Sequence, residues 1–135
     1  MSDRDRNYPT LKYFKRSEFD SPDKKGSGEE MCPAFLQKLD KAREMAGIPF
    51  KITSGYRTQE HHDDLTRRGY QTSKTSAHLK GLAADIHVKD SKSRWLILNA
   101  LILIGMNRIG IGKSFIHCDI DETKTGKVIW TYYKK

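Results

Sequence analysis

The sequence has 135 residues, which predicts a single domain over residues 1–135 with enough chain to bury a hydrophobic core. It has no apolar run of about 18 residues, which argues against a membrane span, and its first ten residues lack the apolar stretch of a secretory signal. Two cysteines argue against a disulfide framework, and the net charge of +8 favours encounter with anionic polymers without defining a function.

The first half of the chain predicts a loop, two helices and a short strand. Residues 21–30 are rich in Ser, Gly, Pro and charge, which is typical of a loop. Apolar residues at helical spacing predict a helix over 32–47, with Pro33 suited to its first turn and a glycine at its end. Residues 49–58 predict a strand that runs into a glycine turn, and 59–69 predict a second helix.

The second half predicts several strands and one apolar helix. Residues 81–88 alternate between an apolar and a polar face, as a half-buried strand does. Residues 92–105 predict a core helix, 108–121 one or two strands, and 127–133 a final strand. Because no regular βαβ alternation is present, we predict an α+β fold with a small antiparallel sheet and flanking helices.

Apolar and aromatic residues of the second half supply the expected core. Trp95 and Ile102 of the predicted helix over 92–105 are expected to be buried. Trp130 and Tyr132 share one face of the last strand. We expect them to pack in the core, and a wall of a peptide groove is the alternative.

The segment "TSAHLKGLAADIHV" places polar residues where a buried strand normally has apolar ones. Asp85 and His87 share a face with Ala83, whose small side chain leaves room beside them. A turn at Gly81 can bring His78 back toward this strand.

The segment "SFIHCDI" presents a second polar face. His117 and Asp119 project on the same side of this strand, while Cys118 points away. Three nitrogen or oxygen ligands, with a fourth position open to water, are what a catalytic zinc site requires. On spacing alone, the alternative is that both strands are edge strands with solvated polar faces.

The stretches "ITSGYRT", "SAHLKGLAADI" and "GIGKSFIHCD" resemble the zinc D-alanyl-D-alanine carboxypeptidase family, peptidoglycan peptidases that share their fold with the zinc-containing domain of Hedgehog signalling proteins. With "LKYFKRSEFDSPD" and "VIWTYY" the resemblance covers nearly the whole chain and looks like the small single-domain branch. It implies that His78, Asp85 and His117 bind one Zn²⁺ per chain. It also implies that Arg57 grips a carbonyl or carboxylate of the peptide, and that Ser76 hydrogen-bonds the substrate or holds the site.

One position departs from this family. Many members carry a carboxylate base three residues before the last histidine ligand, where this chain has Ser114. A serine cannot act as a base near neutral pH. Asp119 is the substitute candidate for the catalytic base because it shares the face of His117. The alternative is that Asp119 orients a histidine ligand through a hydrogen bond.

The remaining histidines are interpreted as surface or structural residues. His61 and His62 are adjacent in a predicted helix, so their side chains point about 100° apart and make a poor chelating pair. Of the two, His62 is the candidate for the lining of a cleft. For His87, a spare ligand or a transition-state donor is the alternative.

The sequence therefore favours a zinc metallopeptidase, a carboxypeptidase or an endopeptidase, that cuts amide bonds in peptidoglycan stem peptides with a zinc-bound water as nucleophile. In this hypothesis zinc and Arg57 polarise the scissile carbonyl, which makes Arg57 a catalytic as well as a substrate-binding residue. A non-catalytic zinc-stabilised domain that binds cell wall or protein is the alternative. Net charge alone suggests nucleic acid, and no recognition motif accompanies it, so no specific nucleic-acid partner is expected. We expect a monomer, made in the cytoplasm and acting on the cell wall after release or export. A phage-encoded lysis or penetration protein fits this description.

Overall fold

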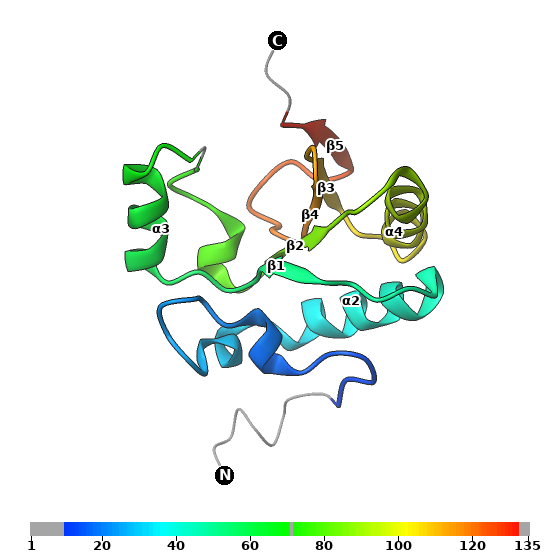
Figure 1. Cartoon of the computed structure of the whole chain (residues 1–135), viewed down its shortest axis with the longest axis horizontal. Coiled ribbons are helices and arrows are strands. Elements are labelled where there is room, and N and C mark those ends of the chain that lie inside the picture. The colour runs from blue at the N-terminus through cyan, green and yellow to red at the C-terminus, as the bar shows by residue number, and fades with distance from the viewer. Residues whose placement is uncertain (1–9, 71, 133–135) are drawn as a thin grey trace.

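The computed structural model describes residues 10–70 and 72–132 (Figure 1). Within these residues the chain combines α-helices and short 3-10 helices with one five-stranded sheet, which confirms the predicted α+β class. In chain order the elements are η1 (Arg16–Phe19), η2 (Ser27–Glu30), α2 (Pro33–Ala46), β1 (Ile52–Ser54), α3 (Gln59–Arg67), η3 (Ala77–Lys80), β2 (Ala83–His87), α4 (Ser91–Leu103), β3 (Arg108–Ile111), β4 (Phe115–Asp119) and β5 (Val128–Thr131). None of the helices in this part of the chain is long and apolar enough to cross a bilayer.

The sheet has the strand order β1-β2-β4-β3-β5. Neighbouring strands are antiparallel except β3 and β5, which are parallel, so the predicted antiparallel sheet holds for all but this pair. The exception has a topological reason. Because β2 and β3 occupy both edges of β4, the chain that leaves β4 turns back along the free edge of β3 and runs in the same direction as β3.

The helices predicted over 32–47, 59–69 and 92–105 correspond to α2, α3 and α4. The strand predicted over 49–58 is much shorter in the structure, where β1 has three residues. The segment 21–30, predicted as a loop, contains the 3-10 helix η2. These differences shorten one strand and add a short 3-10 helix, and they leave the order of the predicted elements unchanged.

The two faces of the sheet have different roles. Figure 1 shows α3 and α4 on opposite sides of the sheet. Ala84 and Ile86 of β2, with Ile116 and Cys118 of β4, belong to the hydrophobic core that also includes buried residues of α2 and α4. Since side chains alternate along a strand, the residues between them project from the opposite face. That second face carries the polar residues.

Helix α4 exposes apolar side chains that the sequence predicts as core. Ile97, Ala100 and Leu101 are buried, whereas Trp95 is 63% exposed and Ile102 is 51% exposed. The prediction of core positions for Trp95 and Ile102 is therefore wrong. The helix is apolar nearly all round, so its sequence does not indicate which stripe meets the core, and packing on one side covers only one stripe.

Candidate metal centre

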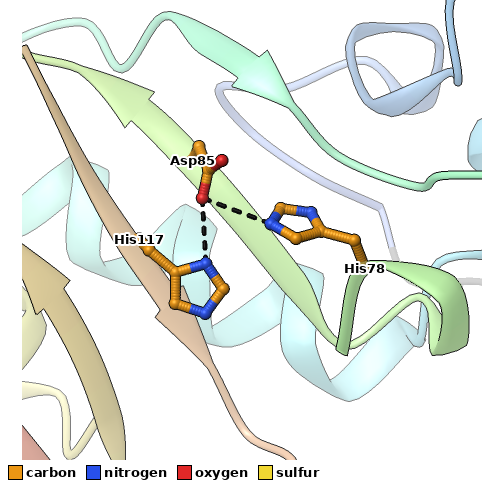
Figure 2. A group of neighbouring side chains, drawn as sticks. All are labelled: His78, Asp85 and His117. Atoms are coloured by element: carbon orange, nitrogen blue, oxygen red, sulfur yellow. Dashed lines mark hydrogen bonds and ion pairs between the residues drawn. The ribbon is translucent and has the colours of Figure 1, made fainter. Parts of the chain in front are cut away.

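Asp85 and His117 meet because the register of β2 and β4 places them directly opposite each other. His78 comes from η3, and Gly81 ends this 3-10 helix with φ at +72°, a left-handed conformation that favours glycine. The predicted turn at Gly81 is therefore confirmed. Figure 2 shows the imidazoles of His78 and His117 directed at the same carboxylate oxygen of Asp85.

The three side chains present their ligand atoms around one point. His78 Nε2 lies 3.2 Å from Asp85 Oδ1, and His117 Nδ1 lies 2.9 Å from the same oxygen. One potential ligand atom from each residue lies within 4.8 Å of the others, and both histidines are buried. Two imidazole nitrogens and one carboxylate are a donor set of catalytic zinc sites, so the residues present fit this metal.

Each imidazole is held by a contact on its far side. His78 Nδ1 lies 2.8 Å from the carbonyl oxygen of Gly55, which can only accept, so Nδ1 carries the proton and Nε2 has the free lone pair. His117 Nε2 lies 2.7 Å from Asp119 Oδ2 and donates to this carboxylate, so Nδ1, which lies 2.9 Å from Asp85 Oδ1, is the nitrogen that would bind a metal. Such partners fix the tautomer and the ring orientation of metal-binding histidines. The second nitrogen of each ring faces Asp85.

Asp119 is occupied by neighbours on both of its oxygens. Besides its contact with His117, its Oδ1 forms an ion pair with Arg108 Nε at 3.0 Å and accepts the backbone N–H of Asp121 at 3.1 Å. Burial raises the pKa of Asp119, but the hydrogen bond and charge of His117, with the charge of Arg108, outweigh burial and hold this pKa below its usual value. This geometry favours the orienting alternative, since a catalytic base would have to leave His117.

A cleft of about 990 Å³ opens beside these side chains. One wall is formed by Trp130 and Tyr132, which the sequence analysis expected in the core. The Trp130 ring centroid lies 5.5 Å from that of His117, and the Tyr132 hydroxyl accepts a hydrogen bond from Trp130. A Cβ on Gly110 would lie only 2.7 Å from both aromatic rings, so a glycine there makes room for this wall. The groove alternative for the two aromatic residues is the one that the structure supports.

Arg57 and Ser76 both line the cleft. The Arg57 guanidinium donates to Ser54 Oγ at 3.2 Å and contacts His62 Nδ1 at 3.4 Å. Ser76 Oγ accepts the backbone N–H of His78 at 3.2 Å, so this hydroxyl caps η3. Ser76 therefore holds the segment that carries a candidate ligand.

Other candidate residues lie away from the three side chains. His87 is exposed and lines a different, smaller cavity, and Ser114 is exposed between β3 and β4 and does not line the cleft. Cys118 is fully buried in the hydrophobic core, so it points away from the site as alternation predicted. Burial raises the pKa of its thiol well above the usual value. The interpretation of His62 as a surface residue is wrong, because His62 is only 3% exposed, and His62 is not among the residues that line the cleft.

Sequence reasoning missed Arg108 as a neighbour of the site. Arg108 pairs with Asp119 because the two residues are opposite each other in the register of β3 and β4. Arg108 also lies over the Trp130 ring, with its guanidinium carbon 4.9 Å from the ring centroid. No local pattern indicates these contacts, which depend on strands that pair after the chain has folded.

The comparisons with known proteins agree with this geometry. The model of a family described as Peptidase M15 matches residues 12–119, which is most of the chain. The chain belongs to the peptidase M15 family. This assignment confirms the resemblance to zinc D-alanyl-D-alanine carboxypeptidases and makes the chain a member of a metallopeptidase family. No curated protein matches the chain.

Asp121 joins two segments that border the cleft. Its side chain is buried, accepts the backbone N–H and hydroxyl of Thr123, and pairs with Lys80 Nζ at 3.0 Å. Burial raises the pKa of Asp121, but the hydrogen bonds from Thr123 and Lys80 outweigh it and lower this pKa to about 2. The carboxylate therefore ties η3 to the segment that follows β4.

We predict that this contact makes stability pH-dependent in acid. The folded-state pKa lies below the unfolded value, so the stabilisation is complete above about pH 4 and is lost as the pH falls toward 2. Asp121→Asn should lower the free energy of unfolding by about 1.5–3 kcal/mol at neutral pH, as for a hydrogen-bonded charge. Urea denaturation between pH 2 and 7 should show this difference shrinking in acid. The matched control, Glu122→Gln, removes an exposed charge from the same segment; a constant difference for Asp121→Asn would contradict the prediction.

Proposed function

We propose that the protein is a zinc-dependent peptidase that cleaves amide bonds in the stem peptides of peptidoglycan. The observation that carries this proposal is the convergence of His78 Nε2, His117 Nδ1 and the Asp85 carboxylate at the side of a cleft, in a member of the peptidase M15 family. The cleft volume of about 990 Å³ supports a peptide substrate, because small-molecule sites occupy roughly 300–1,000 Å³. Both carboxypeptidase and endopeptidase activity fit this cleft.

The three candidate ligands would hold one zinc ion per chain. A zinc ion bound there would supply Lewis-acid polarisation of the scissile carbonyl and a water molecule of lowered pKa as the nucleophile. Asp85 balances part of the charge of the ion. Gly55 and Asp119 keep the two imidazoles in the tautomers that direct Nε2 of His78 and Nδ1 of His117 at the metal.

The chain's own cations orient the substrate. Arg57 has five N–H donors in a planar fork that suits a carboxylate or a carbonyl of the peptide, and the hydrogen bond to Ser54 holds this fork at the cleft. Ser76 supports the His78 segment by its cap. Lys124 also lines the cleft, and stem peptides carry carboxylates, so the charge of the cleft favours their encounter.

A catalytic base for this reaction has to come from a carboxylate at the cleft. Among the described residues that line the cleft, Asp85 and Asp119 are the carboxylates, and Asp85 is a candidate ligand. Asp119 contacts His117 and Arg108. We therefore assign Asp119 first as a positioning residue for His117, and as proton acceptor only if it exchanges that contact for water during turnover.

A non-catalytic zinc-stabilised binding domain is the second candidate. The observation that favours it is Ser114, which takes the place of the usual carboxylate base and lies exposed outside the cleft lining. A protein that retains zinc and binds peptidoglycan, yet releases no fragments from it, would support this second function.

Hydrolysis should depend on the metal and on His78. We predict that the zinc-loaded protein releases new fragments from purified muropeptides, and that a chelator or His78→Ala abolishes the release because a ligand or the metal is removed. His87→Ala is the matched control, since His87 is exposed and outside the cleft lining. Mass spectrometry of the products identifies the bond that is cut. Fragments that persist with chelator would contradict zinc dependence.

Two variants of Asp119 separate a positioning role from a base. If Asp119 orients His117, Asp119→Asn keeps an acceptor for Nε2 and retains zinc and activity, whereas Asp119→Ala loses about 10–100-fold in zinc affinity. If Asp119 is the base, both variants lose hydrolysis while they retain zinc. Zinc titration calorimetry and fragment release, measured on both variants, decide between these roles. We predict the result of a positioning role, in which Asp119→Asn retains zinc and activity and Asp119→Ala binds zinc more weakly.

A further inference from the structure

His62 is a buried histidine beside the substrate cleft that the proposed mechanism does not use. It lies in α3, a helix in which the other described side chains are partly or fully exposed, and is itself only 3% exposed. A buried imidazole needs hydrogen-bond partners for both of its nitrogens. Its partners show what it does.

The two partners of His62 select one tautomer. Nδ1 lies 3.4 Å from a terminal nitrogen of Arg57, and a guanidinium has donors only, so Nδ1 must offer its lone pair. The other partner is the backbone of Ser73. This hydrogen bond raises the pKa of His62, so the imidazole donates it, and the acceptor is the backbone carbonyl of Ser73. Nε2 therefore carries the proton, and the neutral Nε2–H imidazole satisfies both partners at once.

We propose that His62 is a positioning residue for Arg57. It links the Arg57 guanidinium to the segment 73–78, which carries Ser76 and His78. Arg57 is then held at two of its donors, by His62 on one side and by Ser54 on the other. The backbone N–H of Arg57 also donates to the carbonyl of His78 at 3.1 Å. The guanidinium thus enters the cleft in a fixed direction relative to the candidate metal ligands. This inference rests on the proposed function for the part in which Arg57 grips a peptide.

The charges around His62 support its neutral form. Burial lowers its pKa from the usual 6.5, the positive charge of Arg57 lowers it further, and His78 acts in the same direction. Asp63 of the same helix and the hydrogen bond to Ser73 act in the opposite direction without reversing the shift. In sufficiently acidic solution an imidazolium would lose its acceptor and place a second cation beside Arg57, which would release the guanidinium.

Kinetics of three variants test the role in substrate positioning. His62→Asn places its amide oxygen near the position of Nδ1, so it keeps the acceptor for Arg57, and it does not titrate. Its KM should stay close to that of the parent and lose the rise in acid. His62→Ala should raise KM about tenfold, the effect of losing a hydrogen bond to a charged group, with a smaller change in kcat. His61→Ala, on the neighbouring and partly exposed position of α3, should leave KM and its pH profile unchanged. An equal KM for His62→Ala and the parent, with both folded by circular dichroism, would overturn the proposal.

A second readout needs no hydrolysis and remains valid if the peptidase activity fails. Long-range ¹H–¹⁵N NMR spectra should show His62 as the Nε2–H tautomer, with a pKa below 6.5. Arg57→Ala should raise the pKa of His62, because the neighbouring cation is removed. An Nδ1–H tautomer, or a pKa that does not respond to Arg57→Ala, would overturn the contact between the two residues.

Discussion

The register between β2 and β4 is the constraint on which the candidate metal site depends. Asp85 is opposite His117, and on the other face of the same two strands Ile86 is opposite Ile116, with both isoleucines fully buried. A slip of one residue would turn the polar pair into the core and expose the apolar one, at a cost of about 1.5–3 kcal/mol for each large side chain. The hydrophobic alternation of the core therefore also fixes the geometry of the ligands.

Much of the fold follows from patterns that are local in the sequence. The helices α2 and α3 and the strands β2 and β4 have clear periodicities, and α4 is marked by its apolar composition and the glycine that follows it. The exposure of Trp95 could not be predicted, because α4 is apolar nearly all round and only the finished packing decides which stripe is covered. The parallel pairing of β5 with β3 also follows from which strand edges remain free, and no residue of β5 encodes it.

The candidate site also contains some residues that local sequence patterns indicate and others whose roles depend on long-range contacts. Strand alternation and a family motif point to His78, Asp85 and His117, and the structure brings these three residues together. The roles of Asp119 and His62 depend on partners brought close by folding, Arg108 in one case and Arg57 in the other. Sequence alone therefore left Asp119 open between two functions and placed His62 on the surface.

The central claim is that one metal ion is bound jointly by His78, Asp85 and His117. The most direct test is a crystal structure of the zinc-loaded protein with anomalous diffraction measured at the zinc edge. We predict one peak, about 2.0–2.2 Å from His78 Nε2, His117 Nδ1 and an oxygen of Asp85. A zinc ion held by other side chains, or the absence of a peak between these three atoms in fully loaded protein, would contradict the account.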